Sequence, residues 1–149
     1  MFNKKMVFKK IINDPYKVVD EMVEGIVLAH SDLLKFANNN KRAVIRKDAP
    51  IKDKVGILIG GGSGHEPAFL GYVGKGLADA AAIGNVFASP SPDPIVEATK
   101  AISAGMGVVY MYGNYAGDIM NFDMAAEMCE MDNIQVKTVL VTDDIASAP

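Results

Sequence analysis

Cysteine is nearly absent from this 149-residue chain. Its one cysteine, Cys129, has no second thiol with which to form an intrachain disulfide, which fits a reducing, cytoplasmic setting. Long apolar runs are also missing: no stretch of about eighteen apolar residues occurs, so we expect no membrane span. The basic start, MFNKKMVFKKII, has apolar stretches too short and broken for a signal sequence. We interpret its lysines (Lys4, Lys5, Lys9, Lys10) as a solvated tail, with contact to acidic lipid or RNA as the alternative.

Arginine is scarce too, since Arg42 and Arg46 are the only two. A protein that clamps several phosphates unaided usually has more, because the guanidinium fork suits phosphate geometry. The net charge of −3 argues against nucleic acid as the main partner. No cysteine–histidine cluster indicates zinc, so we expect no metal on this chain. Half of the residues are apolar and 22% are charged, as in an ordinary globular protein with one core.

The rest of the sequence alternates between short apolar runs and helical periodicity. A helix begins at Asn13-Asp14-Pro15 and ends near His30, which we expect to be structural. Residues 31–42 are polar and predict a loop. Strands are predicted at 43–46, 55–59, 80–83, 108–112 and 136–141, and further helices at 66–72, 92–104 and 118–131. This alternation predicts one α/β domain over 1–149, with three layers, a largely parallel sheet and helices on both faces.

The most informative segment is GGGSGHEP at 60–67, directly after the predicted strand at 55–59. Four glycines in five residues exceed what a tight turn needs, and a glycine backbone can approach a ligand closely. No Walker lysine follows, and the third glycine of a dinucleotide fingerprint is replaced by His65. We therefore favour a loop whose N–H groups bind a hydroxyl or carbonyl over a turn without ligand. Glu66 is open to a simpler role, as a first-turn carboxylate matched to a helix dipole.

His65 and Asp118 follow two neighbouring strand predictions. Ligands of open α/β sheets bind at the carboxyl edge of the strands, where His65 lies. Asp118 ends the GNYAGD segment, which opens at the same edge if the two strands are parallel. A histidine and an aspartate facing one pocket suit proton transfer from a substrate hydroxyl. The spacing supports equally well an Asp118 that only caps the following helix.

Three other features have plainer interpretations. The SPSPDP segment at 89–94 is a rigid turn that can cap a helix and form the wall of a pocket. Cys129 is expected to be a buried, inert thiol. Six methionines at near-helical spacing are interpreted as core: Met106, Met111, Met120, Met124, Met128 and Met131.

Four segments, in order, resemble the K domain of dihydroxyacetone kinases: GGGSGHEP, GYVGKGLADAAAIGNVFASPSPDPI, GNYAGDIMNFDMA and VTDD. The helix opening IINDPYKVVDEMVEGIVLAH matches as well, so the likeness runs from about Lys10 to the end. The resemblance implies that the chain binds dihydroxyacetone or a similar short ketose. It also implies that ATP or ADP with magnesium is carried by a separate L subunit or domain, recharged in some members by a phosphotransferase-system phosphoprotein. A homodimer is implied for the full-length K subunit.

The resemblance also assigns roles to individual residues. The glycine segment (Gly62, Ser63, Gly64) holds the sugar, His65 hydrogen-bonds the reacting hydroxyl, and Asp118 acts in proton transfer.

Two departures from the family pattern matter. Gly113 stands where many members have a lysine, which removes a sugar contact and makes a four-carbon ketose such as erythrulose plausible. The family's substrate-anchoring histidine lies farther downstream, and His30 does not correspond to it. Family K subunits are about twice this length, so we expect an N-terminal half that is inactive alone. Two alternatives are kept: a ketose-binding transcriptional coactivator or sensor without turnover, and a structural domain without ligand.

Overall fold

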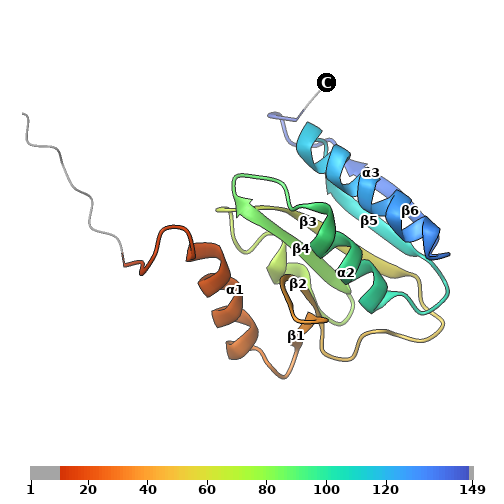
Figure 1. Cartoon of the computed structure of the whole chain (residues 1–149), viewed down its shortest axis with the longest axis horizontal. Helices are drawn as coiled ribbons and strands as arrows, with labels where there is room; N and C mark the ends of the chain where they lie inside the picture. The colour runs from red at the N-terminus through yellow and green to blue at the C-terminus, as the bar shows by residue number, and fades with distance from the viewer. Residues whose placement is uncertain (1–10, 148–149) are drawn as a thin grey trace, which may run out of the picture.

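The computed structural model describes residues 11–147, so the lysine tail at 4–10 lies outside the described residues. The chain forms the elements labelled in Figure 1: α1 (Val18–Ala29), β1 (Leu34–Ala37), β2 (Asn40–Arg46), β3 (Gly56–Ser63), the 3₁₀ turn η1 (Leu70–Tyr72), β4 (Ala80–Val86), α2 (Pro92–Ile102), β5 (Val108–Gly113), α3 (Ala116–Met131) and β6 (Val136–Val141).

The strands form a six-stranded sheet with the order β1-β2-β4-β3-β5-β6. The pairs β3–β4, β3–β5 and β5–β6 are parallel, whereas β1–β2 and β2–β4 are antiparallel. The parallel part arises because α2 and α3 each return the chain to the same end of the sheet. The expected α/β fold with a largely parallel sheet is therefore confirmed.

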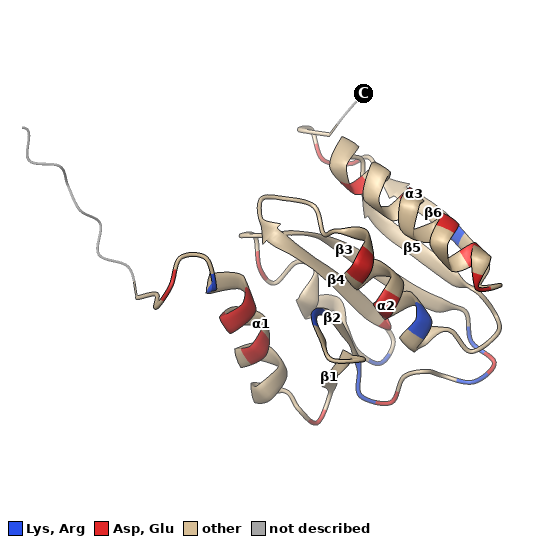
Figure 2. Cartoon of the chain, viewed as in Figure 1, with Lys and Arg blue, Asp and Glu red and all other residues tan. Residues whose placement is uncertain are grey.

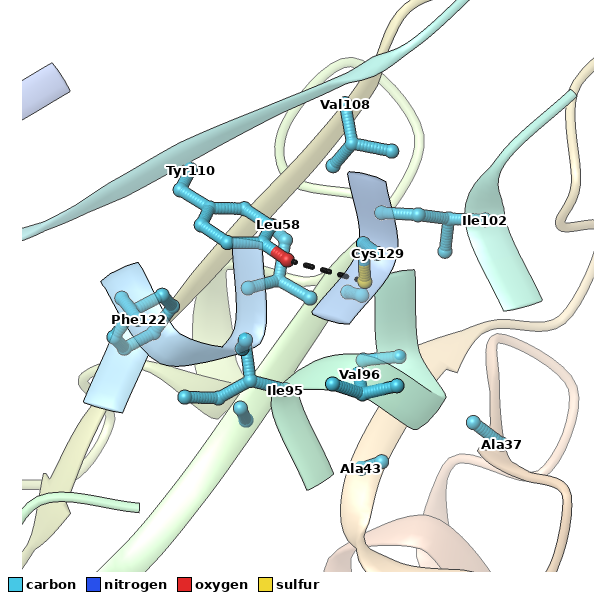
Figure 3. Packing of buried hydrophobic residues seen from close by; sticks show 14 of the residues in the cluster. Ala37, Ala43, Leu58, Ile95, Val96, Ile102, Val108, Tyr110, Phe122 and Cys129 are labelled. Carbon is cyan, nitrogen blue, oxygen red and sulfur yellow. Dashed lines mark hydrogen bonds between the residues drawn. The ribbon is translucent and has the colours of Figure 1, made fainter. Parts of the chain in front are cut away.

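Two apolar cores occupy the two faces of this sheet, because successive strand side chains point in opposite directions. On one face, Leu58 packs with residues of α2 and α3, including Ile95 and Phe122, as Figure 3 shows. On the other face, Ile59 packs with α1 residues such as Val23. The helices therefore cover both faces and give the expected three layers.

Cys129 lies in the first of these cores. It is fully buried, and the Tyr110 hydroxyl donates a hydrogen bond to its Sγ at 3.8 Å (Figure 3). Burial raises the pKa of the Cys129 thiol, so the thiolate is disfavoured. The expectation of a buried, unreactive thiol agrees with this environment.

The prediction of a loop over 31–42 was wrong. This segment contains β1 and the start of β2, which pair antiparallel through a two-residue turn at Asn38 and Asn39. Both turn residues have positive φ, 46° and 67°, as a type I′ hairpin requires. Asparagine adopts this conformation more readily than other side chains, so the run of asparagines that indicated a loop is the turn of a hairpin.

Two helix boundaries also differ from expectation. The first helix begins at Val18 rather than near Pro15, because the Asp14 carboxylate accepts the Tyr16 N–H at 2.9 Å and forms a local turn first. The helix predicted over 66–72 reduces to η1. Pro67 disfavours helical geometry at the residue before it, so no helix begins at Glu66.

The methionines were expected in the core, yet most are exposed. The α3 helix is apolar around much of its circumference, and its contact with the sheet is made by Phe122, Ala125 and Cys129. Ile119, Ala126 and Met128 pack against the edge of this core, and other apolar side chains of the helix face solvent. Exposed methionines are Met106, Met111, Met120, Met124 and Met131, whereas Met128 is partly buried against the core.

Candidate functional site

A cavity of about 600 Å³ opens where β3 and β5 end. These two strands are adjacent and parallel, but the chain leaves them toward opposite faces of the sheet. The connection after β3 carries Leu70 into the α1-side core, whereas α3, after β5, packs on the other face. Such a divergence is the topological switch point at which open α/β sheets bind ligands.

His65 lies at one wall of this cavity, just beyond β3. Its ring is exposed and sits between two aromatic rings. The centroid of Phe69 is 5.4 Å away in an edge-on arrangement, and that of Phe87 is 6.2 Å away. These contacts limit the directions in which the imidazole can turn, while its solvent side stays open to a ligand.

Asp118 lines the same cavity from the first turn of α3. Asp118 is only 5% exposed, and its Oδ1 has no hydrogen-bond partner within residues 11–147. Burial raises the pKa of the Asp118 carboxyl, and the Ser89 hydroxyl and the charge of His65 offset part of that rise. A buried carboxylate oxygen without a hydrogen bond is costly, so a donor from a ligand or a water molecule would stabilise Asp118 here.

The capping interpretation of Asp118 fits the structure less well. The residue at the helix N-cap is Tyr115, whose side chain makes no capping hydrogen bond within residues 11–147, and Asp118 lies in the first turn instead. The structure thus brings into one cavity His65, which follows β3, and Asp118, which lies in the helix after β5. Their roles in binding and proton transfer remain predictions.

Three of the four glycines at 60–64 belong to strand β3 rather than to a loop. Each allows close packing. A Cβ on Gly60 would lie 2.6 Å from the Ala82 carbonyl oxygen, one on Gly61 2.3 Å from the Phe69 ring, and one on Gly62 2.8 Å from the Ala88 nitrogen. Gly64 differs, because its φ of +109° is one that other residues rarely adopt. The glycine richness therefore reflects tight assembly of the cavity wall as well as backbone conformation.

The three residues expected to hold the sugar have different surroundings. Gly62 lines the cavity. The Ser63 hydroxyl is buried and donates to the Gly84 carbonyl at 2.8 Å. The Gly64 N–H donates to both oxygens of the Glu66 carboxylate at 3.1 Å. Glu66 thus stabilises the turn after β3 and is not the helix-dipole partner that its position in the sequence suggested.

Other cavity residues were not singled out from the sequence. Ser89 comes from the turn before α2, and Gly117 leaves room for it, since a Cβ there would lie 2.7 Å from Ser89 Oγ. Tyr115 and Asp144 line the cavity from the β5–α3 connection and from the segment after β6. The sequence analysis expected 89–94 to form a pocket wall and the GNYAGD segment, which contains Tyr115, to open at this edge, but it gave Ser89, Tyr115 and Asp144 no role of their own.

The turn that carries Ser89 depends on Gly84 in β4, which gives a first prediction. A Cβ at this position would lie 2.0 Å from the Ala88 carbonyl oxygen and 2.8 Å from the Pro90 nitrogen. Backbone atoms cannot rotate away, so Gly84→Ala is expected to displace the turn and to lower stability by about 1–3 kcal/mol. Urea denaturation and ligand titration would measure the two effects.

Gly25→Ala is the matched control for that substitution. Gly25 lies in α1, and an added Cβ would have no atom within 4 Å. Alanine is the better helix former, so this variant should gain about 0.5–1 kcal/mol. Equal stability of the two variants would show that the turn at Ala88 adjusts freely.

Two negative findings apply to the described part of the chain. No helix between residues 11 and 147 is long and apolar enough to cross a membrane. Over the same residues, no group of three or more histidine, cysteine, aspartate or glutamate side chains is placed to hold a metal ion.

Curated relatives align with nearly the whole chain. The dihydroxyacetone-binding subunit DhaK of PTS-dependent dihydroxyacetone kinase 2 from Listeria innocua is 56% identical over 94% of this chain and 42% of the relative. L-erythrulose kinase from Pectobacterium atrosepticum is 42% identical over 93% of this chain and 23% of the relative. The chain thus spans about two fifths, or less, of the length of these relatives.

Solved structures share the fold. The dihydroxyacetone kinase of C. freundii, in complex with AMP-PNP and Mg²⁺, superposes with a TM-score of 0.85 at 35% identity, over 93% of this chain and 26% of that chain. The dihydroxyacetone kinase operon co-activator Dha-DhaQ gives 0.78 at 32% identity, over 85% and 38%. The Dak1 domain matches residues 24–149. Because this match takes in most of the chain, we conclude that the protein belongs to the Dak1 domain family.

Proposed function

We propose that this chain is the ketose-binding part of a dihydroxyacetone kinase and positions a ketose hydroxyl for phosphorylation. The observation that carries the proposal is Asp118, a buried carboxylate in a cavity shared with His65, whose Oδ1 lacks a partner among the residues that the structure describes. A substrate hydroxyl would supply the missing hydrogen bond. Asp118 would then take the hydroxyl proton during transfer, while His65 orients the oxygen.

The phosphoryl donor would be held elsewhere. Among the described residues, 11–147, no lysine or arginine lines the cavity. The Arg42 guanidinium pairs with Asp20 at 2.6 Å, and that of Arg46 pairs with Asp48 at 2.6 Å and Asp79 at 3.1 Å. Lysines of the β2–β3 connection lie at the end of the sheet where β3 begins (Figure 2), whereas the cavity lies where β3 and β5 end. We therefore place ATP or ADP and its magnesium on a partner L subunit or domain, which supplies the charge that phosphoryl transfer needs.

The substrate is proposed to be a triose or tetrulose. The walls of the cavity are largely apolar, and its polar lining residues include Asp118, His65, Ser89, Tyr115 and Asp144. Its volume of about 600 Å³ exceeds what a triose fills, and Gly113 adds no side chain. A four-carbon ketose therefore fits, in agreement with the relative named as an erythrulose kinase.

A second candidate function is a ketose-binding coactivator or sensor without turnover. The observation in its favour is Gly113, which leaves the cavity without the lysine that many kinase members have, together with the likeness to the operon co-activator. Its cavity would bind the ketose, but no phosphoryl transfer would follow.

One experiment separates these candidates. The complete gene product, mixed with its L subunit, ATP and Mg²⁺, should phosphorylate dihydroxyacetone or erythrulose, as followed by ADP release or by ³¹P NMR. A parallel reaction with a phosphotransferase-system phosphoprotein in place of ATP covers the donor used by the PTS-dependent relative. Ketose binding without turnover under both conditions would favour the coactivator. If no ketose bound, both candidate functions would be refuted.

The 149 residues alone provide the matching control. We expect them to bind dihydroxyacetone weakly, because a triose offers few atoms and the cavity is open on one side. They should show no kinase activity even with the L subunit, and no stable mass adduct on His65 or His30. Tight binding or an adduct, detected by calorimetry or intact mass spectrometry, would show that the site is complete within this segment.

A further inference from the structure

Tyr115 lies over Gly113 at the rim of the cavity. A Cβ on Gly113 would be 3.1 Å from Cδ2 and 3.2 Å from Cε2 of the Tyr115 ring, so the ring occupies the space that a side chain at 113 would enter. Tyr115 is 41% exposed and lines the cavity. The Tyr115 phenol therefore lies beside residue 113, which is a glycine and offers no polar side chain to a ligand.

The Tyr115 hydroxyl is held in place by Asp144. It donates a hydrogen bond to Asp144 Oδ2, while Asp144 Oδ1 accepts the Ala146 N–H at 2.9 Å. Asn114 ties the same two segments together, since its N–H donates to the Val141 carbonyl at 3.1 Å and its side-chain amide to the Ser147 carbonyl at 2.9 Å. The segment after β6 is thus fastened to the β5–α3 connection, and the phenol has a fixed orientation.

The protonation states of Tyr115 and Asp144 leave the phenol oxygen free to accept a hydrogen bond from a ligand. The hydrogen bond to Asp144 raises the pKa of Tyr115 and lowers the pKa of Asp144. At neutral pH the phenol is therefore protonated and the carboxylate ionised. Because the single phenolic proton points at Asp144, a ligand hydroxyl meets the lone pairs of the Tyr115 oxygen and must act as the donor.

Resting on the proposed function, we propose that Tyr115, oriented by Asp144, accepts a hydrogen bond from the ketose hydroxyl that is not phosphorylated. A short ketose carries a hydroxyl at each end. Asp118 and His65 serve the reacting end, and Tyr115 lies one helical turn before Asp118 at the same cavity. The pair would thus select polyhydroxy ketones over ketones with a single hydroxyl, with Asp144 as a positioning residue.

Calorimetry with two ligands tests this proposal. Dihydroxyacetone and hydroxyacetone differ only in the second hydroxyl. The contribution of the carbonyl to affinity is therefore the same for both ligands and cancels when their affinities are compared. In the complete gene product, Tyr115→Phe should weaken dihydroxyacetone about fivefold, as expected for one hydrogen bond, and leave hydroxyacetone unchanged. Asp144→Ala should weaken dihydroxyacetone as well, and the double variant should be no weaker than Tyr115→Phe alone, because Asp144 acts through the phenol.

Tyr16→Phe is the matched control, because Tyr16 is 94% exposed and is not among the described residues that line the cavity. It should leave both affinities unchanged. Equal losses for both ligands in Tyr115→Phe would mean that the phenol only shapes the cavity, and the proposal would fall. Unchanged dihydroxyacetone affinity, or no wild-type preference between the ligands, would overturn it too. If the protein prefers dihydroxyacetone to hydroxyacetone but phosphorylates neither, the proposed kinase function would be refuted, whereas the proposed role of Tyr115 and Asp144 in ligand selection would stand.

Discussion

Asp118→Asn in the complete gene product is expected to lower kcat by about 10²–10⁴-fold, the usual contribution of a general acid–base group. Asparagine keeps the shape of the side chain but cannot take a proton from the substrate hydroxyl. Affinity for the ketose should change little, because the amide can still hydrogen-bond that hydroxyl. Steady-state kinetics with the L subunit, and a separate ligand titration, would measure the two quantities.

The pH profile gives a second view of the same residue. Burial raises the pKa of Asp118, so the carboxyl stays protonated, and inactive as a base, to a higher pH than an ordinary aspartate. The acidic limb of kcat/KM should therefore lie above pH ~4, the ordinary value for this side chain. In Asp118→Asn that limb should vanish from whatever activity is left.

Stability provides the control for this variant. Since the pKa of Asp118 is higher in the folded chain than in the unfolded chain, its ionisation disfavours folding. That cost is absent below the unfolded pKa of about 3.9 and is complete above the folded pKa. Asparagine avoids it, so Asp118→Asn should melt at the wild-type temperature or higher at pH 7. Near-normal turnover in this variant would mean that Asp118 is not the base.

Local sequence patterns predicted most of the sheet, and the misses have identifiable causes. The parallel strands were predicted because each contains a short apolar run, as in Val136–Val141, where the predicted and observed bounds agree. The β1–β2 hairpin was missed because polar strand residues at a sheet edge look like loop, and the paired asparagines act through positive φ rather than through hydropathy. The hydrogen bond from the Gly64 N–H to the Glu66 carboxylate was missed as well, because such a local contact produces no hydrophobic periodicity in the sequence.

The candidate site was predictable only in part. His65 and Asp118 could be placed together because parallel strands end at one edge of the sheet, and that requires no knowledge of distant contacts. The packing role of Gly60 and Gly61 could not be read from the sequence, since it depends on Ala82 and Phe69, which are distant along the chain or in another element. The Tyr115–Asp144 pair was hidden for the same reason.

Phe122 is the core residue on which the position of Asp118 depends most directly. It lies one turn farther along α3, with no exposed surface. Its ring stacks on Tyr112 at a centroid distance of 4.1 Å and meets Tyr110 edge-on at 5.4 Å. A Cβ on Gly60 would lie 2.9 Å from it, so the ring joins α3 to both β3 and β5. These are the strands whose ends form the cavity.

Phe122→Ala is expected to lower the free energy of unfolding by about 3–5 kcal/mol, because the lost ring contacts are replaced by a void that the strands cannot close. Urea denaturation would measure the loss. Met124→Ala on the same helix is the control, since Met124 is 48% exposed and its truncation should cost less than about 0.5 kcal/mol. Where Phe122→Ala still folds, its kcat should fall, because the first turn of α3, which carries Asp118, is no longer held in place against the strands. The kcat of Met124→Ala should stay normal. If Phe122→Ala loses stability but keeps wild-type kcat at low temperature, Asp118 must be positioned by the Ser89 turn rather than by the aromatic stack.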